Sequence, residues 1–190
     1  PLKSTRSFFI DPKGLGHSMR DLIKLTQEQG GCGVCSLATQ TDQITQTMAA
    51  LRQFVTQVRQ TLTVSGAVDT TVYNARPDVK QKIPYTTLVV HDFPCGFTAQ
   101  AVEDLRTVIE QANECGFTIM VSRSKNDPMD DKAKDLFYNS EKGRRLEYRG
   151  DKCVLHDGDL HLPLRRMEVE ASQDFLREYN ERYSYKPPVK

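Results

Sequence analysis

His91 and Asp92 are the residues whose types and position best suit chemistry. They directly follow the apolar, β-branched run 85–90, and Pro94 comes soon after them. Near-continuous apolarity is typical of a parallel strand buried on both faces, and side chains at the carboxyl end of such a strand face the ligand crevice of an open α/β sheet. We therefore predict His91 and Asp92 as candidate catalytic residues. The alternative is that Asp92 caps the turn into a helix that begins at Thr98, with His91 a solvated residue at the strand end.

A second candidate group lies in the loop 11–16, which follows the first predicted strand at 7–10. We predict that this loop touches a phosphate group or a neighbouring subunit through four residues, Asp11, Lys13, Gly14 and Gly16. The alternative is a tight turn, because proline and glycine are the residues that turns use. Met19 stands where a dinucleotide-binding fingerprint needs its third glycine, which argues against a Rossmann site.

Two further groups contain ligand-like residue types. Cys32 and Cys35 have the spacing of a redox or zinc pair, but the sequence holds no second pair and the motif opens into a strand, so we interpret them as structural thiols. The segment 156–161 contains two histidines and two aspartates, but its Asp-Gly pair favours a turn. We predict no metal site at either group.

Basic side chains gather near the C-terminal end of the chain. A β-hairpin is predicted over 144–155, and alternate residues of a hairpin share a face, so the candidate nucleic-acid contacts are Arg144, Arg145 and Arg149. Glu147 interrupts this basic group. The alternative is therefore a solvated edge hairpin that its charges protect from aggregation.

The elements that position these residues alternate short β-rich runs with longer helical patterns. This alternation is typical of a mostly parallel sheet covered by helices. Strands are predicted at 7–10, 33–38, 85–90 and 117–121, and helices at 18–26, 41–62, 98–112, 131–139 and 168–183. In the longest helix the apolar residues recur at three-and-four spacing, and Thr41 or Asp42 is the expected N-cap.

Composition excludes several classes of protein. The 190 residues include 26 Lys and Arg against 25 Asp and Glu, for a formal net charge of +1. This balance is typical of a globular chain. It excludes a protein whose net positive charge alone would drive binding to polyanions. No apolar run approaches the roughly 20 residues that a bilayer span needs. The five scattered cysteines favour reduced thiols, so we expect a cytoplasmic protein, and because residue 1 is proline we expect a piece of a longer one.

Three stretches now occur in order along the chain: FFIDPKGLG at 8–16, TTLVVHDFP at 86–94 and ANECGFTIMV at 112–121. Together they resemble the FtsK/SpoIIIE family of DNA-translocating ATPases, in particular its divergent members with several ATPase-like modules in tandem. The resemblance spans about residues 7–124. It implies a three-layer α/β fold of the RecA-like, P-loop NTPase type, with a mostly parallel sheet and a small C-terminal hairpin and helix.

The resemblance also implies ATP and magnesium as cofactors of the parent family, and rings of subunits on double-stranded DNA. We expect an ATPase-type core over 1–140 and an appendage over 141–190. In such a fold we expect the strand that precedes the phosphate-binding loop to lie between the strands 85–90 and 117–121. If that strand is absent, those two must pair directly or another segment must fill the gap.

The chain departs from the family at both nucleotide motifs. It contains no G-x-x-x-x-G-K-[ST] sequence, which by family order would precede Pro1. The family strand that resembles 85–90 ends in two acids, one for magnesium and one that polarises the attacking water. Aligned on Phe93, His91 takes the metal-ligand position and Asp92 that of the water-polarising glutamate. An imidazole is a poor ligand for magnesium, which prefers oxygen.

The resulting hypothesis is a degenerate ATPase-like module that holds no cofactor itself. Its expected partners are other ATPase modules of the same polypeptide or further copies of the chain, with DNA a partner of the parent protein. One alternative is part of an active ATP-hydrolysing translocase whose phosphate loop lies upstream of Pro1. Another is a stand-alone interaction domain, which a sheet order unlike that of RecA would support.

Overall fold

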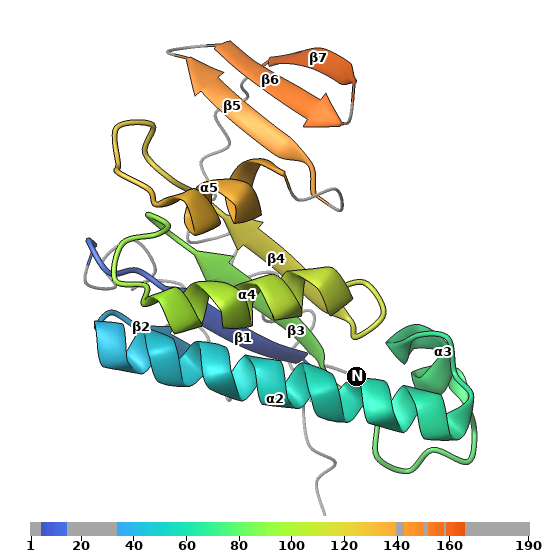
Figure 1. Cartoon of the computed structure of the whole chain (residues 1–190). Coiled ribbons are helices and arrows are strands. Elements are labelled where there is room, and N and C mark those ends of the chain that lie inside the picture. Colours follow the sequence, from blue (N-terminus) through green and yellow to red (C-terminus); the bar gives the residue numbers. More distant parts are fainter. Residues whose placement is uncertain (1–4, 15–33, 140–142, 150–151, 158, 166–190) are drawn as a thin grey trace, which may run out of the picture.

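The computed structural model describes residues 5–14, 34–139, 143–149, 152–157 and 159–165. Within these ranges the chain forms a parallel sheet flanked by helices and a separate small antiparallel sheet (Figure 1). The elements in chain order are β1 (Thr5–Ile10), β2 (Val34–Ala38), α2 (Thr41–Ser65), α3 (Thr70–Ala75), β3 (Tyr85–Val90), α4 (Ala99–Gln111), β4 (Phe117–Val121), α5 (Asp131–Tyr138), β5 (Arg145–Arg149), β6 (Lys152–Asp157) and β7 (Leu160–Arg165). The predicted helices at 18–26 and 168–183 lie outside the described residues.

All four strands of the larger sheet run parallel, in the order β2-β1-β3-β4. The α/β class with a mostly parallel sheet is thus confirmed. β3 pairs directly with β4, with Leu88 opposite Ile119, so no strand lies between them. Because the strands are parallel, their carboxyl ends meet at one edge of the sheet, and the loops that follow β1, β3 and β4 are neighbours there.

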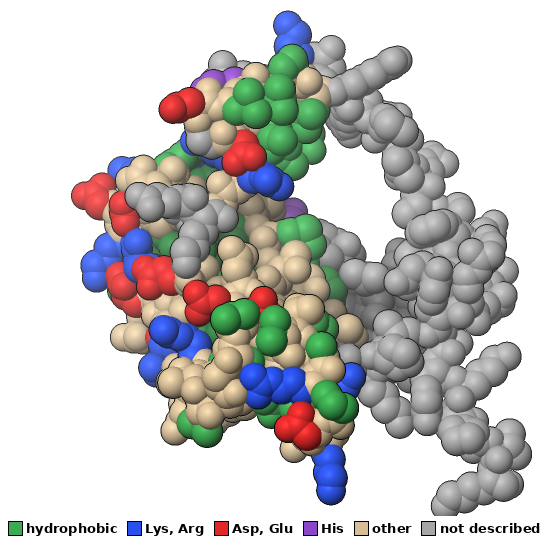
Figure 2. All heavy atoms as spheres, turned by 90° about the vertical axis from the view of Figure 1, so that its right-hand side faces the viewer, with side chains coloured by type: hydrophobic (Ala, Val, Ile, Leu, Met, Phe, Trp, Pro, Cys, Tyr) green, Lys and Arg blue, Asp and Glu red, His purple; other side chains and the backbone are tan. Residues whose placement is uncertain are grey.

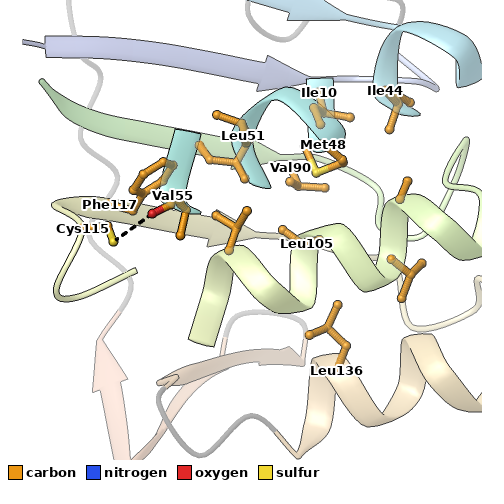
Figure 3. Close-up of a cluster of buried hydrophobic side chains, with 14 of the residues drawn as sticks. Ile10, Ile44, Met48, Leu51, Val55, Val90, Leu105, Cys115, Phe117 and Leu136 are labelled. Atoms are coloured by element: carbon orange, nitrogen blue, oxygen red, sulfur yellow. Dashed lines mark hydrogen bonds between the residues drawn. The ribbon is translucent and has the colours of Figure 1, made fainter. Parts of the chain in front are cut away.

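The helices α2 and α4 lie side by side over one face of this sheet (Figure 1). The predicted apolar stripe of α2 is buried in full, and its members are Ile44, Met48, Leu51, Val55, Val58 and Leu62. Figure 3 shows the stripe residues Ile44, Met48, Leu51 and Val55 in one cluster with side chains of β1, β3 and α4. The stripe forms because residues three and four apart share a face of a helix.

The N-terminus of α2 differs from its prediction. The N-cap is Gln40, not Thr41 or Asp42. The side chain of Gln43 folds back and its Oε1 accepts the backbone N–H groups of Thr39 at 3.0 Å and Gln40 at 3.3 Å. A glutamine at the third helical position can satisfy donors that precede a helix, so the helix starts without a short polar cap residue.

The small antiparallel sheet has one strand more than the predicted hairpin. β6 pairs with β5 on one side and with β7 on the other, in the order β5-β6-β7. The turn that the Asp-Gly pair of 156–161 favoured is confirmed, because β6 ends at Asp157 and the antiparallel β7 begins at Leu160. The third strand follows from the alternation of Leu160, Leu162 and Leu164 with other side chains, which has the period of a strand. No helix among the described residues has the length and apolar character needed to cross a bilayer.

Leu105 of α4 tests the contribution of this core. It is fully buried between α2 and the sheet (Figure 3), so Leu105→Ala should leave a cavity and lower the free energy of unfolding by about 2–5 kcal/mol. Urea unfolding followed by circular dichroism measures the change. The matched control is Val64→Ala on α2, where 84% of the side chain is exposed and a change under about 0.5 kcal/mol is expected. Equal effects of the two substitutions would contradict this view of the core.

Cys115 gives a second test, of thiol reactivity. Its Sγ lies 3.8 Å from the carbonyl oxygen of Val55 (Figure 3), and burial raises the pKa of its thiol to about 11. The thiolate is the reactive form, so iodoacetamide at pH 8 should label half-buried Cys95 at least about tenfold faster than Cys115. Peptide mapping by mass spectrometry measures both sites.

The same pKa fixes the pH dependence of stability. The folded state holds the Cys115 proton more tightly than a thiol of ordinary pKa, 9.0. This contribution to stability is complete below pH 9 and is lost as the pH rises through about 11. A Cys115 that is labelled as fast as Cys95 in the folded protein would show that the thiol is not buried in solution.

Candidate functional site

Three side chains meet where β1 and β3 end: Asp11, His91 and Asp92. The parallel register places Ile10 opposite Val90, so the next residues of the two strands, Asp11 and His91, are adjacent. The Nδ1 atom of His91 lies 3.5 Å from Oδ1 of Asp11 and 3.0 Å from Oδ2 of Asp92. One ligand-type atom from each residue falls within 4.8 Å of the others. The structure thus joins residues that the sequence placed in two separate candidate groups.

Backbone hydrogen bonds fix this edge of the sheet beyond the last strand residues. The N–H of Asp11 donates to the carbonyl of Ala38 at 3.1 Å, and the N–H of His91 donates to that of Ile10 at 2.8 Å. The N–H of Phe93 donates to the carbonyl of Ser122 at 2.9 Å. The three bonds tie the ends of all four strands together. The positions of Asp11 and His91 are therefore set by the sheet rather than by a loop.

The turn after His91 has an unusual backbone at Asp92, whose φ of 57° lies in the left-handed region. Few residues other than glycine adopt this conformation, and aspartate is among those that tolerate it. The turn is anchored by Phe93, which is buried and packs edge-on against Phe97. The helix cap is supplied by Thr98, whose Oγ1 accepts the N–H of Ala101 at 3.1 Å. The carboxylate of Asp92 instead lies against His91.

Asp11 is the most deeply buried member of the group, with no exposed surface. Its Oδ1 accepts the backbone N–H of Gly14 at 3.0 Å. Its Oδ2 is also buried and has no hydrogen-bond partner among the described residues. A buried carboxylate oxygen without a donor costs free energy, so this atom leaves an interaction unmade.

Lys13 is directed to a partner that the sequence reasoning did not single out. Its Nζ lies 2.7 and 2.6 Å from the two carboxylate oxygens of Asp127, in the loop after β4. The hydrogen bond to Asp127 raises the pKa of Lys13, and this outweighs the effect of desolvation. A contact between Lys13 and a phosphate would have to replace this ion pair. The polar stretch after the strand 117–121 was visible in the sequence, but nothing in it indicated which acid Lys13 would bind.

Position 14 requires glycine because the Asp11 carboxylate lies very close to its Cα, and not because of its backbone angles. A Cβ atom at this position would lie 2.5 Å from both carboxylate oxygens of Asp11. Any larger residue would push that carboxylate out of place. Gly16, the other glycine of the predicted contact loop, lies outside the described residues, so a phosphate or subunit contact through this loop stays a prediction.

An open hollow of about 500 Å³ lies at the same edge of the sheet, and its lining does not include Asp11, His91 or Asp92. It is bounded by the loops after β1 and β2, by the start of α2 and by the turn after β3, and it is lined by Pro12, Thr39, Gln40, Thr41, Asp42, Cys95 and Gly96. Its lining is mostly polar, and among the described residues it includes the hydroxyl side chains of Thr39 and Thr41 and no Lys or Arg side chain.

The predicted nucleic-acid contacts on the small sheet have partners within the chain. Nε of Arg144 lies 2.9 Å from Oδ2 of Asp157, and the guanidinium of Arg145 lies 5.6 Å from the centre of the Tyr138 ring. The side chain of Arg149 is outside the described part of the structure. On the face drawn in Figure 2 basic and acidic side chains are interspersed, and hydrophobic side chains gather on the small sheet. A nucleic-acid contact here stays a prediction.

Gly14→Ala tests the close approach of this loop to Asp11. The backbone at Gly14 is open to alanine, so only the contact between the new Cβ and the Asp11 carboxylate should matter, and we expect a loss of about 1–3 kcal/mol in stability. Chemical denaturation measures it. In an Asp11→Ala background the clash partner is missing, and the double-mutant cycle should show an interaction energy of about 1 kcal/mol or more. Strict additivity would mean that the two residues do not touch.

Comparison with protein-family models and with curated proteins finds no match to this sequence. Solved structures do match the fold. The pCW3 conjugation coupling protein TcpA, in its monomer form with ATPγS, is 14% identical with a TM-score of 0.60, over 86% of this chain and 52% of TcpA. ATPases 2 and 3 of EssC from Geobacillus thermodenitrificans are 10% identical with a TM-score of 0.66, over 100% of this chain and 40% of that one.

A third similar structure is the cytoplasmic domain of the Type VII secretion ATPase EccC from Thermomonospora curvata. It is 16% identical, with a TM-score of 0.52, over 93% of this chain and 23% of EccC. The chain thus spans about half the length of the TcpA chain and less than half the length of the EssC and EccC chains. At such low identity the similarity concerns the fold. The chain has an FtsK/SpoIIIE-like, P-loop ATPase-type fold.

Proposed function

We propose that this chain is a degenerate ATPase-like module, which does not hydrolyse ATP and contacts other ATPase modules of the same polypeptide. The observation that carries the proposal is His91 at the carboxyl end of β3. Its Nδ1 lies 3.0 Å from Oδ2 of Asp92, at the strand end where this fold is expected to supply a carboxylate to magnesium.

The three residues at this strand end do not fit magnesium. Mg²⁺ demands near-octahedral coordination by oxygen and usually keeps several waters. Here the group supplies an imidazole nitrogen between two carboxylates, and one of these, Asp11, is fully buried. No catalytic step through magnesium is therefore assigned to these residues.

The lack of a phosphate-binding motif in these 190 residues supports the same proposal. In P-loop proteins the loop backbone and a lysine hold the phosphates, and a following serine or threonine holds the metal. The 190 residues contain no such motif. Lys13, the lysine in the loop after β1, forms an ion pair with Asp127.

Contacts between modules are supported by the kind of protein that shares the fold. The EssC structure holds two ATPase modules, numbered 2 and 3, and this chain covers 40% of it. EccC is a secretion ATPase of which this chain covers 23%. A single module of such a protein has neighbours in the same chain. We infer that residues 1–140 form the core of one module in a longer motor of conjugation or secretion type.

The alternative is a module that is catalytically active in the longer protein, with a phosphate-binding loop supplied from upstream of Pro1. Its support is TcpA, whose structure contains ATPγS. The two proposals differ in the role of Asp92. In the active module this carboxylate would orient the attacking water, whereas in the degenerate module it has no part in ATP turnover.

Two measurements test the proposals. Isothermal titration of the 190-residue chain with Mg-ATP should show no binding with micromolar affinity. Such binding would overturn the degenerate module, whereas its absence fits both proposals, which only the second measurement separates. The second measurement uses the full-length protein of which this chain is part. There Asp92→Asn should change the ATPase rate by less than about twofold, because Asp92 has no part in ATP turnover in the degenerate module. A loss of about 100-fold or more, which is typical of removing a group that acts in the transition state, would establish the active alternative.

A further inference from the structure

We propose that Asp11, His91 and Asp92 form a binding site for a divalent first-row transition-metal ion, for which Zn²⁺ is the best-fitting probe. This inference is independent of the proposed function, because it requires neither ATP nor a partner module. It concerns a cation that binds through nitrogen and oxygen together, in place of the oxygen-only magnesium site expected of the fold.

The donor atoms determine the class of cation. One imidazole nitrogen with carboxylate oxygens is a ligand set that zinc proteins use, with Zn–N and Zn–O distances of about 2.0–2.2 Å. Imidazole also suits other first-row transition metals, whereas magnesium and calcium favour oxygen alone. Three protein ligands leave one position of a tetrahedral ion open to water, as in zinc sites that are not closed.

The distances between donors agree with a single small ion. Tetrahedral coordination at these bond lengths separates neighbouring ligand atoms by roughly 3.4 Å. Nδ1 of His91 lies 3.0 Å from Oδ2 of Asp92 and 3.5 Å from Oδ1 of Asp11, and all three residues have donors within 4.8 Å of one another. The donors of Asp11 and Asp92 are bounded only by the 4.8 Å limit, so reaching the tetrahedral spacing of roughly 3.4 Å takes a movement of up to about 1.4 Å, which a rotation of the partly exposed Asp92 side chain can supply.

An independent observation points to a missing ligand at this place. Asp11 is fully buried and its Oδ2 has no hydrogen-bond partner among the described residues. The Nδ1 of His91 is likewise buried and makes no well-directed hydrogen bond there. A cation bound by the Asp11 carboxylate and by this nitrogen would supply the missing partner, whereas Lys13 is already engaged by Asp127.

Hydrogen bonds from neighbouring groups hold the proposed ligands in place, as is usual for metal ligands in proteins. The backbone N–H of Gly14 donates to Oδ1 of Asp11 at 3.0 Å and so orients that carboxylate. Asp11 and His91 are both fixed by backbone hydrogen bonds to the neighbouring strands. His91 retains 39% side-chain exposure, which gives an ion a path from solvent. A bound ion would link the ends of β1 and β3.

Zinc titration of the metal-free 190-residue chain tests the proposal. The chain is first treated with EDTA, which is then removed. Calorimetry with ZnCl₂ should then show binding, and the affinity for MgCl₂ should be at least about 100-fold lower. His91→Ala should weaken this event at least about tenfold, since losing a ligand costs no less than losing a supporting group. Asp92→Asn should act in the same direction. Both side chains are partly exposed, so folding should survive, and circular dichroism checks this.

Two matched controls exclude zinc bound elsewhere. His156→Ala with His161→Ala removes the histidine pair of the small sheet, whose Nδ1 atoms lie 2.7 Å apart. Cys32→Ser with Cys35→Ser removes the cysteine pair. Neither control should alter the event that His91→Ala weakens. Zinc binding that survives His91→Ala and Asp92→Asn unchanged, no zinc binding by the folded chain, or magnesium binding of equal strength would each overturn the proposal.

Discussion

The parallel pairing of β1 with β3 is the constraint on which the site depends. With Ile10 opposite Val90, the hydrogen-bond ladder carries one residue further and places Asp11 beside His91. Because side chains alternate along a strand, a slip of one residue would turn the whole apolar set of β1 away from the core. The buried side chain of Ile10 therefore fixes the register, and the register brings the carboxylate to the imidazole. Packing and chemistry are coupled at this one strand end.

This coupling explains how a carboxylate can be held without contact with water. Burial of a charged group is tolerated when hydrogen bonds, ion pairs or metals compensate it. Asp11 has one backbone donor from Gly14 and the His91 ring at 3.5 Å, and one of its oxygens has no donor among the described residues. The surrounding sheet keeps the group in place through bonds made by the main chain. The site is thus organised before any ligand arrives, which lowers the cost of binding one.

The fold and the site lead to different functional conclusions. The sheet order, the helices and the similar structures identify an ATPase-type scaffold. Function resides in particular side chains, however, and one scaffold carries many functions. The imidazole at the end of β3 and the lysine paired with Asp127 are the two features on which the proposed degenerate module rests. Under that proposal the module keeps the shape of an ATPase while its own site is free to take another ligand.

The sequence by itself determined the elements whose pattern is local. The runs 85–90 and 117–121 are strands with the predicted bounds, and the buried stripe of α2 follows from three-and-four spacing. It also identified Asp11 in one candidate group and the adjacent pair His91 and Asp92 in another. Only the tertiary structure decided that they meet, that β3 pairs directly with β4, that Lys13 reaches Asp127 and that β7 joins the small sheet. The reason is physical: periodicity reports which face of an element is buried, whereas pairing between distant residues depends on sheet order and register, to which no local pattern is sensitive.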